Sequence, residues 1–463
     1  MSETLSRISL DSSAGDLVAA LAARKVSALE LADEAIARVE TRDTAINAVV
    51  VRDFDRARQA AREADAALAR GERGPLLGLP MTVKESHNIA GLPTTWGIAE
   101  AKDWIASSDS VGVTRLKAAG AVILGKTNVP VFLADFQTVN PVYGRTNNPW
   151  DLSRGPGGSS GGGAAAVAAQ MIPLEFGSDI GGSIRNPAHF CGIYGHKPSY
   201  GLVPLRGHQP PFVPDGGVDV VLAVVGPLAR TAADLERALD VLAGPDDLDA
   251  TGYQLALPPP RRLKLAEHRV LVIDEHPSAG VDAEIRAGLN GLADRLAALG
   301  AKVSRGSPLT PDLAQERRDY GAMLDVAMSR GRPGVQTISA HEWMGLLDGQ
   351  MASRRRWAAL FEAFDVVLTP VMGVAAFEPI DQPAQDRKLI IDGEPTPYFD
   401  QLGWAGMATY PNLPATVAPL GQTKAGLPFG VQIIGPYLED RTSIAFAGLL
   451  EREFGGFRAA PGF

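Results

Sequence analysis

Apolar and polar residues alternate along this chain in two different rhythms. Up to about residue 75, apolar positions recur at the spacing of a helix, as in SALELADEAIARVE, where Ser27 and Glu30 also match a capping box. From residue 79 onward, short apolar runs such as LPMTV, AVILG and IPLEFG alternate with segments of small residues at helical spacing. Strands that alternate with helices are typical of an α/β fold with a buried and partly parallel sheet.

The same pattern predicts the domain organisation. We find no internal repeat, and we predict one domain over residues 1–463, with a helical segment at 1–75 that packs on the core. Residues 245–265 are rich in proline and aspartate, and 372–400 are polar and irregular, so both are predicted to be surface excursions. We expect 205–222 and 372–400 to shape the entrance to a site.

Charge and cysteine content narrow the function classes. The chain has 44 basic and 53 acidic residues, a formal net charge of −9 and no basic run, so we expect neither nucleic acid nor a membrane surface as a partner. Its single cysteine, Cys191, cannot form an intrachain disulfide, which fits a reducing compartment. A signal-peptide pattern and an apolar run of about 18 residues are both missing, so we predict a cytoplasmic protein.

A glycine-rich stretch, GPGGSSGGGAAAVAA at 155–169, is the first candidate for chemistry. A phosphate-binding loop needs a lysine after the glycines, and a dinucleotide-binding loop needs a strand before them, so both interpretations are disfavoured. A flexible linker is open but unexpected between a strand-rich region and a helix. The GxSxG pattern at 157–161 could be a nucleophile elbow, although the strand that precedes such an elbow is missing and no later histidine has a distinctive context.

A second serine explains more of the sequence. In GSDIGGSIRNPAHFCG, Ser183 follows a predicted strand and a double glycine, and it lies 24 residues after Ser159. The turn exposes the successive backbone N–H groups of Ile180, Gly181, Gly182 and Ser183. Such a row of donors binds anions, and beside a serine hydroxyl it can serve as an oxyanion hole.

A serine nucleophile also needs a base. Lys84 ends the apolar run in GLPMTVKES, where burial would disfavour its charged form and lower its pKa toward neutrality. A lysine or a serine alone is most often a solvated surface residue. The three contexts together, in this order, predict a serine hydrolase with a lysine base and without a metal or cofactor.

Three segments, 78–97, 126–170 and 175–204, resemble the amidase signature family, and weaker similarity extends the match to roughly 14–454. The resemblance implies an α/β amidase signature fold. In that fold a large, mixed, partly parallel central sheet is covered by helices on both faces.

The resemblance also implies a Ser–cisSer–Lys triad. By its motifs, Ser183 is the nucleophile, Ser159 the bridging serine that follows a cis peptide bond, Lys84 the base and Ser160 a supporting hydrogen-bond donor. In this sequence Glu85 and Ser178 stand where many relatives carry aspartate and threonine. Both keep a polar group, so the expected chemistry is unchanged.

Several neighbouring residues have two interpretations. Asp179 and Arg185 either orient the row of N–H donors at 180–183, here called the nest, and the helix after it, or they form a structural ion pair. Cys191 and His196 could form a Cys/His pair, although a small buried thiol is favoured. His87 lies close to Lys84 in sequence and is either a loop histidine, which we favour, or a residue of the pocket.

The substrate is less constrained than the reaction. The apolar segment VPVFLADF offers Phe132, Leu133 and Phe136 as pocket residues, and Trp404 adds aromatic surface. These residues favour hydrolysis of apolar or aryl linear amides, with anilides, carbamates or esters as related substrates. The alternative is the glutaminase component of a tRNA-dependent amidotransferase, which needs charged groups for the two ends of glutamine. The expected partners are an amide and water, and a homodimer is left open.

Overall fold

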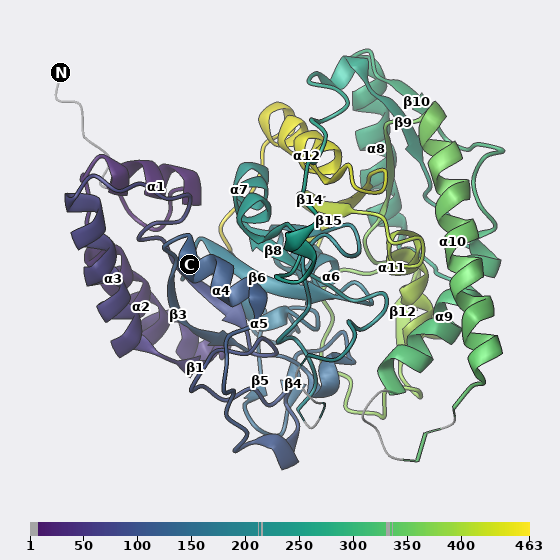
Figure 1. Cartoon of the computed structure of the whole chain (residues 1–463). Helices are drawn as coiled ribbons and strands as arrows, with labels where there is room; N and C mark the ends of the chain where they lie inside the picture. Colours follow the sequence, from purple (N-terminus) through teal and green to yellow (C-terminus); the bar gives the residue numbers. More distant parts are fainter. Residues whose placement is uncertain (1–7, 212, 214–215, 330–333, 336) are drawn as a thin grey trace.

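A computed structural model describes residues 8–211, 213, 216–329, 334–335 and 337–463. Parts of the predicted segments 1–75 and 205–222, namely 1–7, 212 and 214–215, lie outside the described residues. One 11-stranded mixed sheet forms the centre of the fold, in the order β1-β3-β2-β6-β8-β7-β14-β15-β11-β9-β10 (Figure 1). The predicted α/β fold with a large, partly parallel central sheet is confirmed.

Parallel pairs occur near both edges of this sheet, and its central pairs are antiparallel. Strand β2 runs parallel to both β3 and β6, and β9 runs parallel to β10 and β11, whereas the remaining pairs are antiparallel. The strands are β1 (Val49–Arg52), β2 (Pro80–Lys84), β3 (Val122–Thr127), β6 (Leu174–Asp179), β7 (Tyr194–Lys197), β8 (Val224–Ala229), β9 (Arg269–Val272), β10 (Lys302–Ser304), β11 (Val366–Pro370), β14 (Ala415–Gln422) and β15 (Pro428–Ile434).

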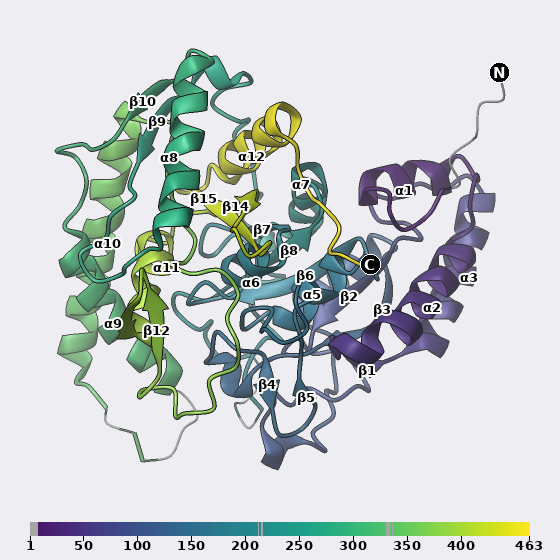
Figure 2. The same cartoon turned by 180° about the vertical axis from the view of Figure 1, so that it is seen from behind.

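Helices flank the sheet at both ends and cover it between them. The N-terminal helices stand on one flank and α9 and α10 on the other, in both views (Figures 1 and 2). The helices are α1 (Ala14–Ala22), α2 (Ala28–Ile46), α3 (Phe54–Ala69), α4 (Val111–Ala118), α5 (Gly161–Ala168), α6 (Arg185–Cys191), α7 (Ala232–Leu242), α8 (Ala283–Ala298), α9 (Leu313–Ser329), α10 (Ala340–Ala363), α11 (Leu402–Thr409) and α12 (Asp440–Phe454). None of the helices in the described ranges combines the length and the apolar character needed to cross a bilayer.

The N-terminal segment is built into the core. Apolar residues of α1 to α3 belong to the largest hydrophobic cluster, together with residues of β2, β3 and α5. The predicted capping box of α2 is present, since Ser27 Oγ accepts a hydrogen bond from Glu30 N–H and the Glu30 carboxylate accepts one from Ser27 N–H. Because one sheet runs through most of the chain, the single domain over 1–463 stays our prediction.

The two predicted surface excursions differ. Residues 249–256 are exposed, as expected for 245–265. The segment 372–400 is more ordered than predicted, because it contains a hairpin of β12 (Lys388–Ile391) and β13 (Glu394–Pro397). Several of its apolar residues, including Met372 and Tyr398, are buried in a cluster with Phe136 and Phe190. We therefore correct this part of the prediction: alternating polar residues conceal a half-buried hairpin.

Candidate active site

The candidate residues meet where two neighbouring parallel strands end. Lys84 is the last residue of β2, and Asp179 is the last residue of β6, which is hydrogen-bonded to β2. The carboxyl ends of parallel strands lie at the same edge of a sheet, and α/β proteins place their sites there. Ser159 and Ser183 come to this edge from the turns just before α5 and α6, two helices that pack against each other.

Lys84 is fully buried and held by two hydroxyl groups. Its Nζ lies 2.6 Å from Ser159 Oγ and 2.8 Å from Ser178 Oγ. Burial lowers the pKa of Lys84 from 10.5 to about 7, although the negative charges of Asp179 and Glu175 act in the opposite direction. A large share of this amine is therefore neutral at physiological pH and can accept a proton.

A buried carboxyl group lies beneath the lysine. Thr82 and Lys84 are two residues apart on β2, so their side chains point to the same face of the sheet. Glu175 of the neighbouring strand β6 is paired with Thr82. The Glu175 carboxylate accepts hydrogen bonds from the hydroxyl groups of Thr82 and Thr127, the latter at 2.6 Å. Burial raises the pKa of Glu175 to about 7, so the charge beneath Lys84 changes within the pH range in which Lys84 itself titrates.

Ser159 sits in a turn that only glycines can form here. The Gly158–Ser159 peptide bond is cis, as the resemblance implies. A Cβ on Gly158 would lie 2.2 Å from the backbone oxygen of Asp135, so no larger residue fits at this position. Ser160 supports the turn: its N–H donates to the Ser183 carbonyl at 3.0 Å, and its Oγ donates to the Ser178 carbonyl at 3.2 Å.

Three of the four backbone N–H groups predicted at 180–183 are available as donors, and the fourth corrects the prediction. The Gly182 N–H, which we expected in the oxyanion hole, donates to Asp179 Oδ1 at 3.0 Å and is therefore occupied. The N–H groups of Ile180, Gly181 and Ser183 donate to none of the described residues. Gly182 has a φ of +95°, a left-handed conformation that favours glycine and turns its N–H toward the carboxylate.

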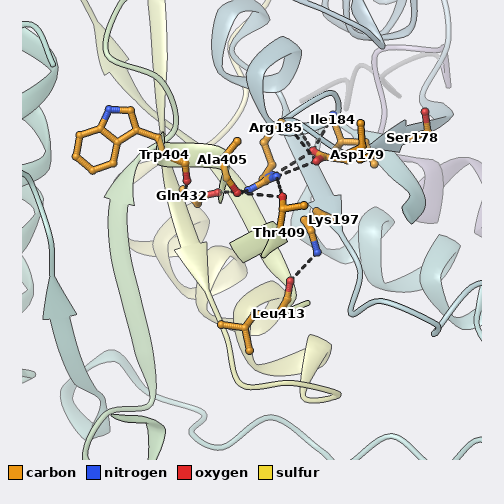
Figure 3. A network of polar contacts seen from close by, with 12 residues as sticks. Ser178, Asp179, Ile184, Arg185, Lys197, Trp404, Ala405, Thr409, Leu413 and Gln432 are labelled. Carbon is orange, nitrogen blue, oxygen red and sulfur yellow. Dashed lines mark hydrogen bonds and ion pairs between the residues drawn. The ribbon is translucent and has the colours of Figure 1, made fainter. Parts of the chain in front are cut away.

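Asp179 and Arg185 fix this turn, and Figure 3 shows the network they form. The Asp179 carboxylate also accepts the Ile184 N–H at 3.0 Å, and it pairs with the Arg185 guanidinium through Nη2 at 2.8 Å and Nε at 3.0 Å. Burial acts to raise the pKa of Asp179, but the charge and hydrogen bonds of Arg185 hold it at about 2. The two residues thus form a buried ion pair and also hold the turn in place. Both roles considered from the sequence, a structural ion pair and orientation of the nest, describe them.

Two cavities open beside Ser183. The inner cavity, about 50 Å³, contains Ser159, Ser178 and Ser183 in its wall; its apolar lining includes Trp96, Phe132, Leu133, Pro210, Val220 and Met328. The outer cavity, about 420 Å³, shares Leu133, Ile180, Ser183 and Met328 with the inner one. Phe136 lines the outer cavity. The three predicted pocket residues of 132–136 therefore lie at the site.

Trp404 lies elsewhere, which corrects the prediction. Its side chain is fully buried in a separate hydrophobic cluster with Trp357 and Met407, and its indole N–H donates to the Gly280 carbonyl at 3.2 Å. In Figure 3 its indole points away from Asp179 and Ser178. Tryptophan is a large apolar residue, and sequence alone does not distinguish a pocket wall from the core.

The structure gives roles to residues that the sequence left without one. Ser178 is the second hydroxyl partner of Lys84, and the Tyr320 hydroxyl donates to the Ile180 carbonyl at 2.7 Å, which holds the nest from the other side. His208 lines the inner cavity, and its ring packs at a tilt against the rings of Trp96 and His87. Burial lowers the pKa of His208 to about 3, so its imidazole is neutral.

The remaining histidine and cysteine candidates do not form a second catalytic pair. His87 is buried, stacks on Phe176 and is not among the residues that line either cavity. Cys191 is buried, and burial raises the pKa of its thiol far above the usual range, whereas His196 is bonded to Thr416 and Asp440. Among the described residues, no group of three His, Cys, Asp or Glu side chains is arranged to hold a metal ion.

Comparisons with known proteins agree with this geometry. The family model described as Amidase matches residues 30–332 and 316–444. The A component of the glutamyl-tRNA(Gln) amidotransferase of Acidothermus cellulolyticus is 33% identical, with 95% of this chain and 94% of the relative covered. The human fatty-acid amide hydrolase 2 is 30% identical over 95% of this chain and 88% of the relative.

A solved structure matches the whole fold. The crystal structure of a bacterial aryl acylamidase of the amidase signature family superimposes with a TM-score of 0.82 at 26% identity, and 96% of each chain is covered. The range 30–332 matched by the family model includes Lys84, Ser159 and Ser183. The chain therefore belongs to the amidase signature family.

Proposed function

We propose that this chain is a stand-alone serine amidase that hydrolyses the C–N bond of apolar or aryl linear amides, in the cytoplasm and without a cofactor. The observation that carries the proposal is the 2.6 Å bond between Lys84 Nζ and Ser159 Oγ, in the wall of the cavity that also holds Ser183. A lysine with a pKa of about 7 at this place can act as the base of a serine relay.

The reaction begins with two proton transfers. Neutral Lys84 takes a proton from Ser159 Oγ, Ser159 takes one from Ser183 Oγ, and Ser183 Oγ forms a bond to the amide carbon. The described hydrogen bonds include none between the two serine hydroxyls. We expect the Ser183 hydroxyl to turn toward Ser159 by a change of rotamer when substrate fills the cavity, since catalytic hydrogen bonds often tighten only in the complex.

The free N–H groups of the nest then stabilise the negative charge on the carbonyl oxygen. Ile180, Gly181 and Ser183 provide these donors, while Gly182 keeps its bond to Asp179. The C–N bond breaks, Ser159 returns a proton to the leaving amine, and the acyl group stays on Ser183 as an ester. Water attacks this ester through the same relay and releases the carboxylic acid.

A serine-reactive fluorophosphonate tests the assignment of the nucleophile. Intact-mass and peptide analysis should place a single adduct on Ser183 in the wild type and none on the Ser183→Ala variant. Ser153→Ala, the same substitution at an exposed serine, serves as the matched control and should label like the wild type. An adduct that persists on another serine in Ser183→Ala, together with retained turnover of acetanilide, would exclude the mechanism.

The second candidate is the glutaminase component of a tRNA-dependent amidotransferase. It is supported by the 33% identity to a protein of that kind over nearly the full length of both chains. We favour the stand-alone amidase because, among the described residues, the inner cavity has no charged side chain in its lining apart from Asp179, which is already paired with Arg185, and the other charged side chains beside Ser183 line only the outer cavity. Purified chain alone should hydrolyse anilides. Ammonia release from glutamine only after the other components of such an enzyme are added would favour the second candidate.

A further inference from the structure

The outer cavity differs from the inner one in containing a free positive charge. Arg317 and Gly321 of α9 line it, together with Phe399 and with Ser183 itself. Its volume of about 420 Å³ is within the range of ligand pockets, which begins at about 300 Å³. One half of any amide held at Ser183 can therefore extend into this cavity and toward Arg317.

Arg317 is only partly satisfied by the protein. Its Nη2 donates to the Phe399 carbonyl at 3.1 Å, which fixes the guanidinium against the cavity wall. Its Nε is buried without an acceptor, and Nη1 donates to none of the described residues. No carboxylate of the described residues lies within ion-pair distance of Arg317. Guanidinium groups bind carboxylates strongly through such donors, so an unpaired one in a cavity wall is an anion-binding group.

The helix makes room for this guanidinium. Gly321 lies one turn after Arg317, and a Cβ at this position would be 2.9 Å from Arg317 Nη1. Glycine in the middle of a helix is unfavourable by about 0.5–1 kcal/mol relative to alanine. Here it leaves space in which the arginine lies across α9 and faces the cavity.

The acidic groups nearby do not neutralise this charge. Asp135, which also lines the cavity, is bound to Arg387 at 2.6 Å and to the Tyr398 hydroxyl at 2.7 Å. Asp325 lies two helical turns further along α9 and is exposed. Burial raises the pKa of Asp400, and the charge of Arg317 only partly offsets this, without an ion pair between them.

We propose that Arg317 is a specificity residue that binds a carboxylate on the substrate, so that this amidase prefers amides that combine an apolar or aryl group with a carboxylate on the other side of the scissile bond. The proposal rests on the proposed function, since it concerns the same cavity at Ser183. The carboxylate stays unchanged in the reaction: it positions the amide by a charge-assisted hydrogen bond while the C–N bond is hydrolysed.

Two pairs of anilides test this preference and locate the carboxylate. Glutaric monoanilide against hexananilide places the charge in the acyl half, opposite an aryl amine, and 4-(hexanoylamino)benzoate against 4-isopropylhexananilide places it in the amine half, opposite an apolar acyl chain. We expect the charged member of one pair to have a kcat/KM about 10- to 100-fold higher than its neutral counterpart, as expected for one charged hydrogen bond. The pair that shows the difference identifies the half of the substrate that occupies the outer cavity.

Variants assign the preference to Arg317. Arg317→Met should abolish the preference, because kcat/KM should fall about 10- to 100-fold more for the charged anilide than for its neutral counterpart. Arg318→Met removes the same charge from the next residue of α9, which is exposed and bonded to Gln315, and it should retain the preference. Gly321→Ala should reduce the preference while the helix gains stability, which separates displacement of the guanidinium from loss of folding.

The outcomes separate this inference from the proposed function. Hydrolysis of the neutral anilides without a preference for either charged partner overturns the role of Arg317 and leaves the amidase assignment intact. A preference that survives in Arg317→Met also overturns it. If none of the four anilides is hydrolysed by the wild type, the proposed function itself fails.

Discussion

The pKa of Lys84 gives the sharpest prediction about catalysis. At its ordinary pKa of 10.5, only about one lysine in 3,000 is neutral at pH 7, whereas at a pKa of about 7 roughly half are neutral. Burial thus increases the population of the neutral amine, the form that the proposed mechanism uses as base, by about three orders of magnitude at neutral pH. We expect kcat/KM for hexananilide to rise about tenfold per pH unit below pH 7 and to level off above it.

The assay needs a substrate that does not titrate, and hexananilide meets this condition between pH 5 and 9. Release of aniline gives kcat/KM at each pH, and circular dichroism at the same pH values verifies that the chain stays folded. Lys84→Met, which keeps the apolar stem and removes the amine, should lose at least a thousandfold of activity at every pH. A wild-type profile that is flat from pH 5 to 9, or that rises only near pH 10, would refute the reasoning.

The same pKa has a consequence for stability with a defined sign. The folded-state pKa of Lys84, about 7, lies below its unfolded value of 10.5, so the unfolded chain binds more protons between these two values. The cost of burying Lys84 is therefore complete below about pH 7 and diminishes as the pH rises toward 10.5. The free energy of unfolding of the wild type should increase across this window relative to Lys84→Met. Urea titrations at several pH values measure the difference.

Three further substitutions test the surroundings of the lysine. Glu175→Gln removes a negative charge that raises the pKa of Lys84, so the acidic limb of the pH–rate profile should move to lower pH; a limb that stays in place would assign no role to this charge. Asp179→Asn leaves Arg185 buried without its ion-pair partner and should lower the free energy of unfolding in urea by about 3–5 kcal/mol. Ser178→Ala removes one hydroxyl partner of Lys84 and should lower kcat about tenfold, with recovery in Ser178→Thr; unchanged kcat in the alanine variant would contradict the positioning role.

Much of the fold follows from local patterns. Helix α2 has the capping box and the helical spacing that the sequence shows in SALELADEAIARVE, and it extends over Ala28–Ile46. The short apolar runs that become β2, β3 and β6 are correctly predicted because each is bounded by turn-forming residues. The sequence does not predict helix α9 or the β12–β13 hairpin, since their exposed residues are mixed with buried ones and their burial depends on neighbours distant in sequence.

For the candidate site, the sequence by itself determines the chemical groups. Lys84, Ser159 and Ser183 stand out because the glycines and apolar runs around them are unusual for a lysine or a serine on the surface. Which of the surrounding groups are free is decided only by the tertiary structure. The Gly182 N–H, which the sequence predicts as an oxyanion donor, is occupied because it donates to the Asp179 side chain.

The same distinction applies to the substrate pocket. Phe132 and Trp404 are equally apolar in the sequence, yet one lines the cavity and the other is packed in a separate core cluster. Arg317 gives no signal in the sequence, where it is one of many charged residues on a helix. It becomes a candidate for substrate recognition only in the folded chain. The fold places it in the wall of a cavity with Ser183 and leaves its Nε and Nη1 without an acceptor among the described residues. Only the tertiary structure decides this, because hydrogen-bond partners and burial are set by contacts between segments that are distant in sequence.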